Sequence, residues 1–294
     1  MGTVVVDHQV MVDRLPERDA KCEILTDRYQ IGGPVPTALT LLRRWGIGTS
    51  FLGAWFGDRE GELIEADLIS SGVQVDSRSH LREGRSGFAH VWVEKGTGRR
   101  SIAAFRGSRE VSIDDIAPER LGSFDVLHLD GWSTEAALVA AKAMNSTGGM
   151  VFIDLGSPKK RLSELLNEVS YLNCPLRLVH RLCGCHDPVE GARALLGERT
   201  RFVTVTDGEK GAWLVPAEGE ALFCPGLKVR AIDTNGAGDT FSGALIYAVK
   251  QQWNELGVLR FASAAAGLKC RALGNREALP TLDEVLFAAK ELGG

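Results

Sequence analysis

The sequence predicts an α/β protein with three αβα layers, a mostly parallel sheet and a small separate β-sheet. After about residue 110, short apolar runs alternate with helical segments, a pattern typical of parallel strands joined by crossover helices. Before that point, short strand-like segments surround one helical stretch, and two of them flank a glycine-containing turn at 94–98. The 294 residues contain no linker, repeat or low-complexity tract, which favours a single domain over 1–294.

The first part of the chain is predicted to be mixed. Its elements in order are strands at 10–12 and 22–26, a helix at 36–45, a strand at 50–54, a helix at 60–70, and hairpin strands at 87–93 and 100–105. In the first hairpin strand, Phe88, His90 and Trp92 alternate with Ala89, Val91 and Val93, so neither face is purely polar. An antiparallel flap covered on one face by a ligand or a partner would have this pattern.

The second part is more regular. The strands expected here are 125–129, 150–154 and 202–206, with a hairpin of 212–215 and 221–224, and the helices are 134–145, 236–252, 254–271 and 281–292. Asp187-Pro188 followed by Glu190 is a helix-start signature, and Thr281 with Glu284 forms a capping box.

Composition excludes several classes of protein. The net charge of −4 gives no basic surplus for nucleic acid, and no apolar stretch approaches the ~20 residues of a membrane span. The acidic residues Asp7 and Asp13 interrupt the apolar run that a signal peptide needs. The six cysteines include no CxxC pair, which favours buried thiols in a reducing compartment over a zinc site. We expect a cytoplasmic protein.

The segment DTNGAGDTF at 233–241 contains the residues that best indicate a catalytic function. It follows an extended stretch and opens a long apolar helix, where unpaired backbone amides and the helix dipole form an anion site. Asp239 lies inside that site. A carboxylate there would repel phosphate, but it suits a base that deprotonates a hydroxyl attacking a phosphoryl group. The alternative is a glycine-rich turn with an ordinary acidic residue at the helix start.

The DTxGAGD pattern resembles the C-terminal signature of the ribokinase-like, or PfkB, carbohydrate kinase family. Further similarities are IGG at 31–33, the FLGAWFGDREG segment at 51–61, TDGEKG at 206–211 and the 260–266 stretch. The resemblance implies a Rossmann-like fold with a β-sheet lid formed by about 7–31 and 86–106. Lids of this family often pair two subunits, so a homodimer through the lid is expected.

The resemblance also implies roles for individual residues. Asp239 would be the catalytic base, and Gly236, Ala237 and Gly238 would form the anion hole. The sugar would be bound by Asp7, Gly32, Gly33, Thr37, Asp130 and Asp239, and ATP with Mg²⁺ by Thr206, Gly208, Gly211, Gly238 and Ser263. Asp233, Asn235 and Gly274 would surround a monovalent cation such as K⁺. At a helix N-terminus, Asp239 is expected to be a weakened base.

Three departures from the family pattern bear on substrate and metal. Thr37 stands where the family usually has an asparagine facing the sugar. The family's Asn-x-x-Glu lacks its acid after Asn173, so Mg²⁺ is expected to be held chiefly by ATP and water. Three features are most similar to the sulfofructose-kinase branch: GGPVPTA at 32–38, the 260–270 stretch and Lys21. Gly131, however, replaces an arginine of that branch, which argues against a sulfonate substrate.

We expect transfer of the ATP γ-phosphoryl group to a sugar hydroxyl, with two alternatives. Phe88 and Trp92 are suited to an aromatic pocket for a nucleoside, so an adenosine-type kinase is one alternative. The missing Asn-x-x-Glu acid favours a catalytically weak sugar-binding regulator, whereas Asp239 and its glycines oppose it. Arg106 is a candidate clamp for an acidic substrate, and an exposed loop cation is about equally consistent with the sequence.

The last expectation concerns the first residues. In similar proteins a buried central strand precedes a glycine at the position of Gly2, and Asp7 follows a few residues later. This places the sequence about six to ten residues short of a complete strand at its N-terminus. The alternative is a genuine short start in which another segment fills the gap.

Overall fold

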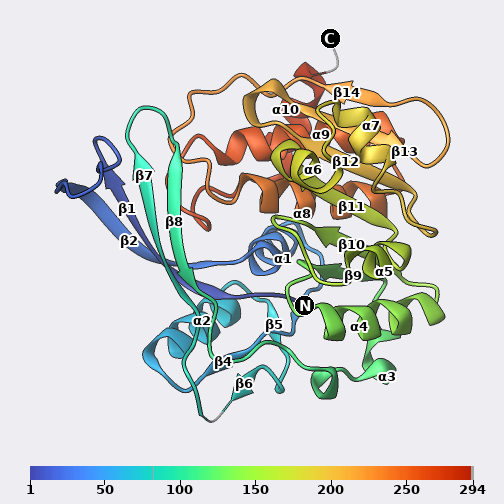
Figure 1. Ribbon diagram of the computed structural model, residues 1–294, viewed down its shortest axis with the longest axis horizontal. Helices are drawn as coiled ribbons and strands as arrows, with labels where there is room; N and C mark the ends of the chain where they lie inside the picture. Colours follow the sequence, from blue (N-terminus) through green and yellow to red (C-terminus); the bar gives the residue numbers. More distant parts are fainter. Residues whose placement is uncertain (82, 293–294) are drawn as a thin grey trace.

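Two β-sheets organise the molecule (Figure 1). The structure is a computed structural model that describes residues 1–81 and 83–292. The larger sheet has six strands in the order β14-β13-β12-β11-β10-β9. β9 to β12 run parallel, and β13 and β14 continue the sheet antiparallel. The strands are β9 Val126–Leu129, β10 Met150–Asp154, β11 Tyr171–Pro175, β12 Phe202–Thr206, β13 Ala212–Pro216 and β14 Leu222–Cys224.

Helices cover both faces of this sheet and complete the three predicted layers (Figure 1). One face packs Phe152, Tyr171 and Phe202 against helices α1 (Pro34–Arg44), α8 (Ala237–Lys250), α9 (Glu255–Lys269) and α10 (Leu282–Glu291). The other face packs Ile153, Leu172 and Val203 against α4 (Thr134–Ser146), α5 (Leu162–Asn167), α6 (Leu176–Cys183) and α7 (Pro188–Arg193). Because successive strand residues point to opposite faces, both faces must be apolar, which explains the unbroken apolar runs of these strands.

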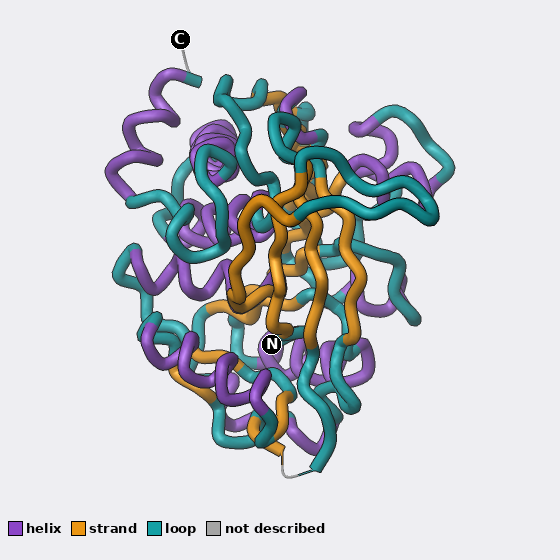
Figure 2. Tube along the Cα trace, turned by 90° about the vertical axis from the view of Figure 1, so that its left-hand side faces the viewer, coloured by secondary structure: helices purple, strands orange, loops and turns teal. Residues whose placement is uncertain are grey.

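The smaller sheet is the lid, whose long strands face the viewer in Figure 2. Its order is β2-β1-β7-β8, comprising β1 Val5–Val12, β2 Ile24–Gly32, β7 Phe88–Glu94 and β8 Arg100–Phe105. Ala89, Val91 and Val93 are buried with Val5, whereas His90 and Trp92 are exposed. The alternation of the hairpin sequence therefore separates a buried face from an outer aromatic face.

Short elements connect the lid to the main body. β3 (Ser50–Phe51) pairs with β5 (Gln74–Val75), and β4 (Trp55–Phe56) pairs with β6 (His80–Leu81). Asp58 caps the start of α2 (Arg59–Ser70), and its carboxylate accepts the Gly61 amide. The remaining short helices are η1 Ile113–Asp115, α3 Pro118–Leu121 and η2 Gly208–Lys210. None of the described helices is both long and apolar enough to cross a membrane.

Most expected elements are present, and the differences have local causes. The strand expected at 50–54 is shorter, because β3 ends at Phe51 and the Gly53 amide donates to Ser79 Oγ instead of to a neighbouring strand. β1 begins at Val5 rather than at residue 10. The polar residues Asp7 and Gln9 are buried there, so this part of the strand lacks the apolar pattern that predicts a buried strand. β11, α5 and α6 are present without having been predicted.

Candidate active site

The start of α8 forms the centre of the site. Gly236 precedes the helix with φ 78°, a left-handed conformation that favours glycine, and a Cβ there would lie 2.8 Å from Asn275 Oδ1. The helical bonds begin with Thr240 N–H donating to Gly236 O at 2.9 Å. The backbone amides of Gly238 and Asp239 therefore belong to the first turn, whose N–H groups point away from the helix. Open space surrounds the Gly238 Cα. The residues expected to form the anion hole, Gly236, Ala237 and Gly238, therefore lie at the start of this helix.

Asp239 lies in this first turn, where burial raises the pKa of its carboxyl group. Arg100, Lys269 and Arg276 lower that pKa, and Asp130 raises it further. The expectation that the helix N-terminus makes Asp239 a weakened base is therefore wrong. Desolvation outweighs the three cations, so Asp239 holds a proton more readily than an ordinary aspartate.

Asp7 lies on β1 of the lid, across from the start of α8. Burial raises the pKa of Asp7 to about 7, while a hydrogen bond from Asn235 lowers it and the Asp239 carboxylate raises it. The Asn235 Nδ2 donor lies 3.5 Å from Asp7 Oδ2. Gly32 is in close contact with the same carboxylate, because a Cβ at residue 32 would lie 2.4 Å from Oδ2. The structure thus brings together Asp7, Gly32, Asn235 and Asp239, which are far apart in the sequence.

Thr37 and Gly33 lie beside this group at the start of α1. Gly33 precedes the helix, and Thr37 is fully buried in its first turns. Arg276 Nη1 lies 3.4 Å from Thr37 Oγ1, and its charge lowers the pKa of both Asp7 and Asp239. Asp67 fixes the guanidinium with hydrogen bonds of 3.0 and 2.9 Å. Arg276 was not predicted, since it follows α9 in an irregular segment with no motif around it.

Asp130 follows β9, but its oxygens already have backbone partners. Oδ2 accepts the Thr3 amide at 2.6 Å, and Oδ1 accepts the Trp132 amide at 2.9 Å. Beside it, the Trp132 ring contacts two cations, with Arg106 at 4.0 Å and Lys159 at 4.8 Å from its centroid. Asp130 therefore holds the first residues of the chain in place at the edge of the site.

A chain of buried side chains that sequence reasoning missed leads to Asp154. Thr204 Oγ1 donates to Asn173 Oδ1 at 3.0 Å, Asn173 Nδ2 donates to Ser242 Oγ at 3.0 Å, and Ser242 Oγ donates to Asp154 Oδ2 at 2.9 Å. Burial raises the pKa of Asp154 to about 7, and the Asp239 carboxylate contributes. Asp154 ends a predicted strand, and ligands of parallel sheets bind at the carboxyl ends of strands. The position of Asp154 at the end of a predicted strand was therefore a signal available in the sequence.

The residues that are expected to bind the nucleotide lie together near the end of β12. Thr206 ends this strand, and the turn Gly208–Lys210 leads to Gly211, where a Cβ would lie 2.1 Å from Cys224 O. Ser263 is buried on α9 beside Cys224, and burial raises the pKa of the Cys224 thiol. Cys224 thus connects Ser263 to the Thr206–Gly211 turn.

The three residues expected around a monovalent cation, Asp233, Asn235 and Gly274, do meet, but two of them contact the third as hydrogen-bond donors. The amides of Asn235 and Gly274 donate to the Asp233 carboxylate at 2.8 and 3.1 Å. The Lys269 ammonium lies 3.1 Å from Asp233 O and 3.3 Å from Oδ2. The expected ligands are oxygens, and the two Asp233 oxygens that could bind a cation already contact this ammonium. The donor set therefore does not fit an additional K⁺ ion.

Comparison with known proteins assigns the chain to a protein family. A sequence model described as "pfkB family carbohydrate kinase" matches residues 1–282. The chain belongs to this family. The PfkB kinase is 25% identical over 288 residues to ketohexokinase of Mus musculus, with 93% of this chain and 96% of the relative covered. It is 28% identical over 290 residues to an ATP-dependent ribose-1-phosphate kinase of Halopiger xanaduensis, covering 97% and 95%.

Solved structures of ribokinases share the fold of this PfkB kinase. Arabidopsis thaliana ribokinase complexed with ribose and ATP superposes with a TM-score of 0.80 at 26% identity, covering 98% of this chain and 97% of that one. A protein described as a putative ribokinase from Agrobacterium tumefaciens gives a TM-score of 0.87 at 24% identity, covering 99% and 96%. The PfkB kinase is an ATP-dependent carbohydrate kinase.

Proposed function

We propose that this kinase transfers the γ-phosphoryl group of MgATP to a hydroxyl of a small sugar held between β1 and the start of α8. The observation that supports this is the position of Asp239. Its carboxylate lies in the first turn of α8 with a raised pKa, and it interacts electrostatically with Asp7 on the lid. A base near an anion hole and near a second carboxylate suits a substrate that has both a reacting hydroxyl and further hydroxyls to anchor.

In this mechanism Asp7 and Asn235 orient the sugar, and Asp239 accepts the proton of the attacking hydroxyl. The amides of Gly238 and Asp239, together with the helix dipole, stabilise the charge that develops on the transferred group. Phosphoryl transfer passes through a loose transition state, so positioning and electrostatics provide most of the rate. The raised pKa of Asp239 fits this task, because a base works best when its pKa approaches the working pH.

The nucleotide would lie over the Thr206–Gly211 turn, with its base near Ser263. Ser263 supports this assignment because its hydroxyl is buried without a hydrogen-bond partner among the described residues. Mg²⁺ would arrive with ATP and keep most of its waters. Asp154 is placed to accept hydrogen bonds from such waters, since Ser242 occupies only its Oδ2.

A sugar that carries an acidic group is a second candidate substrate. Arg106 and Lys159 lie on the same Trp132 ring at the edge of the site. Burial lowers the pKa of Lys159, and the nearby Asp130 carboxylate raises it. Two cations held by one ring would bind a carboxylate or phosphate of the substrate. This candidate predicts that Arg106→Gln raises KM for acidic sugars and leaves KM for neutral sugars unchanged.

The outer lid face supports the expected homodimer. Tyr29 is 55% exposed and stacks on His8 at 4.5 Å, and Phe88 packs near Phe105 at 5.8 Å. Exposed aromatic residues gathered on one face are typical of a protein interface. Sedimentation velocity should give a dimer that Tyr29→Asp weakens, and a monomer at micromolar concentration would contradict this proposal.

ATP consumption over a panel of neutral sugars, acidic sugars and nucleosides tests the proposed function. We expect turnover with a neutral or acidic sugar that Asp239→Asn abolishes. Turnover with nucleosides alone would favour the nucleoside kinase. Sugar binding without turnover would favour the regulator.

A further inference from the structure

A fully buried lysine lies against the turn that leads into α8. Lys269 is the last residue of α9, and its side chain and that of Asp233 are both fully buried. A lysine is almost never completely buried unless its charge is paired. The Lys269 ammonium lies 3.1 Å from the Asp233 carbonyl oxygen and 3.3 Å from its Oδ2 atom. Lys269 thus places a positive charge against the first residue of the 233–238 turn.

The same side chain packs against the glycine that precedes α8. A Cβ at Gly236 would lie 3.6 Å from the Lys269 Cε atom and 2.8 Å from Asn275 Oδ1. The space behind Gly236 is therefore filled, and the turn cannot move toward α9 without displacing Lys269 or Asn275. A change at Lys269 would in turn shift the backbone amides at the start of α8.

The Asp233 carboxylate has partners from several segments of the chain. Its Oδ1 atom accepts the Asn235 amide at 2.8 Å. Its Oδ2 atom accepts the Gly274 amide at 3.1 Å and the Gln9 side chain of the lid at 2.9 Å, and it also faces the Lys269 ammonium. Three of these four donors are neutral. Without Lys269, a buried carboxylate would therefore be left uncompensated, which is strongly destabilising.

A free monovalent cation at this turn would need the atoms that Lys269 already uses. Carbonyl and carboxylate oxygens bind such an ion. The Asp233 carbonyl oxygen and Oδ2 both contact the ammonium. A second positive charge at these oxygens would be repelled by the first, and burial strengthens that repulsion because it lowers the local dielectric constant. The positive charge at this turn is thus the covalently attached one.

The charge of Lys269 also acts on Asp239. Lys269, Arg100 and Arg276 lower the pKa of Asp239, and burial raises it. Lys269 is the only fully buried one of these three cations, so solvent screens its charge least. Burial lowers the pKa of Lys269, and the Asp233 carboxylate opposes that effect. The ion pair therefore helps to maintain a positive charge close to the expected base.

We propose that Lys269 is a positioning residue whose tethered ammonium takes the place of a free monovalent cation beside the 233–238 turn. The disagreement between the donor set and a K⁺ ion is the basis of this inference. It rests on the proposed function, because the turn is taken to bind the transferred phosphoryl group. A covalently attached charge is present at every salt concentration, so the kinase should need no K⁺.

Lys269→Met tests the proposal, because methionine keeps an unbranched side chain but has no charge. Turnover and Tm are compared in K⁺, NH₄⁺ and tetramethylammonium at equal ionic strength. The unmodified chain should be indifferent to the cation. In tetramethylammonium, which is too large to replace the ammonium, the variant should lose at least about ten-fold in kcat and at least about 5 °C in Tm. K⁺ or NH₄⁺ should restore much of both.

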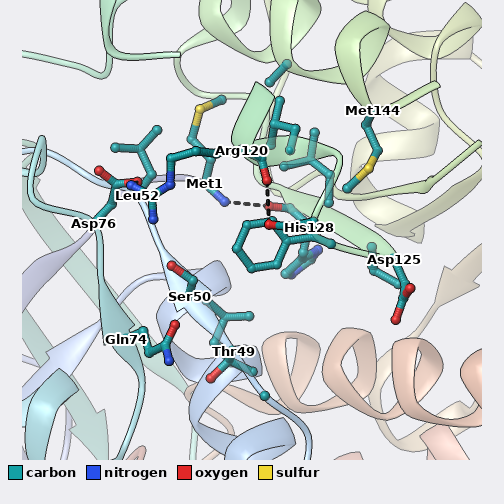
Figure 3. Close-up of a pocket in the computed structure, with 18 of the residues that line it drawn as sticks. Met1, Thr49, Ser50, Leu52, Gln74, Asp76, Arg120, Asp125, His128 and Met144 are labelled. Atoms are coloured by element: carbon teal, nitrogen blue, oxygen red, sulfur yellow. Dashed lines mark hydrogen bonds and ion pairs between the residues drawn. The ribbon is translucent and has the colours of Figure 1, made fainter. Parts of the chain in front are cut away.

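Lys250→Met is the matched control, because it also removes a lysine that ends a helix and pairs with an aspartate. Lys250 ends α8 and pairs with Asp125, which Figure 3 shows beside a pocket of about 550 Å³. The 14 residues of α8 place Lys250 about 20 Å from the 233–238 turn. Lys250→Met should therefore keep kcat, and its Tm should be the same in all three salts.

Two further measurements separate a positioning role from a purely structural one. Lys269→Met should move the acid limb of the kcat/KM profile to higher pH, because the pKa of Asp239 rises when a nearby cation is lost, and K⁺ should move it back. Adding Asp233→Asn to Lys269→Met should abolish the Tm response to K⁺, because the carboxylate that would bind the ion is gone. The variants retain the other charged groups that interact with Asp239, namely Arg100, Arg276, Asp130, Asp7 and Asp154.

Three results would overturn the inference: a K⁺ requirement in the unmodified chain, a Lys269→Met variant that behaves like Lys250→Met, and a Lys269→Met variant that is equally impaired in all three salts. If Lys269→Met fails to fold in every salt, Lys269→Gln serves instead with the same expected cation response. The Tm comparisons need no turnover, so they stand even if the substrate proposal fails. That failure would instead appear as an unmodified chain that phosphorylates no sugar.

Discussion

Gly32 and the Asp7 carboxylate are in such close contact that a Cβ on residue 32 would lie 2.4 Å from Asp7 Oδ2. The antiparallel register of β1 and β2 pairs Val5 with Gly32 and so brings the end of β2 beside Asp7. The glycine therefore leaves room for the carboxylate, and its role is steric. This contact links the lid to the start of α1, where the sugar is expected.

Gly32→Ala should displace Asp7 by several tenths of an ångström or more and lower kcat/KM for the sugar by about 100-fold, the usual effect of misplacing a site group by ~1 Å. Steady-state kinetics with the sugar varied would measure this. Gly48→Ala is the control, because a Cβ there meets nothing within 4 Å. Equal kinetics in the two variants would contradict the steric role.

Asp239→Asn should lower kcat by about 10³-fold or more while ATP affinity stays within a few-fold, because the variant keeps the shape but loses the base. Single-turnover kinetics and ATP titration separate the two effects. Residual activity near that of the unmodified chain would exclude Asp239 as the base.

Asp7→Ala should raise KM for the sugar by about 10- to 100-fold, because a carboxylate hydrogen bond to a hydroxyl contributes about 1.5–3 kcal/mol. KM for ATP should stay unchanged. The opposite pattern, an altered ATP KM with an unaltered sugar KM, would place Asp7 on the nucleotide side.

Asp154→Asn should raise the Mg²⁺ concentration needed for half-maximal rate, because the variant loses a charged acceptor for the waters of MgATP. Asp207→Asn is the matched control, since Asp207 pairs with the exposed Lys210 and should change Mg²⁺ dependence little. A stronger effect at Asp207 would show that the metal is held at the Thr206–Gly211 turn.

The contribution of Asp7 and Asp154 to stability should fall as pH rises from about 4 to about 7. Burial raises the pKa of Asp7 and of Asp154 to about 7, so the folded state binds more protons than the unfolded state in this range. The cost of ionising each buried carboxyl is complete above the folded pKa. Asp154→Asn should therefore raise the free energy of unfolding at pH 8 by roughly 2–4 kcal/mol, and by much less at pH 4. Urea unfolding across this range measures it, and a pH-independent difference would contradict the assignment.

Local patterns in the sequence were sufficient for much of the fold. The α8 motif, the capping box at Thr281 and Glu284, and the hairpin of β7 and β8 were all predicted, and the structure contains each of them. Each depends on residues close together in the chain, where spacing alone determines which side chains meet. The family assignment rests on the same kind of local signal.

Tertiary structure decided what depends on burial and on distant contacts. The raised pKa of Asp239 results from groups on separate elements. The Thr204–Asn173–Ser242–Asp154 chain and the Lys269–Asp233 pair likewise join residues from separate elements. The sequence by itself identified residues that could do chemistry and the helix start that is expected to bind an anion. Only the packed structure decided how strongly each carboxyl group holds its proton, because desolvation depends on what surrounds the group in space and not on its neighbours in the chain.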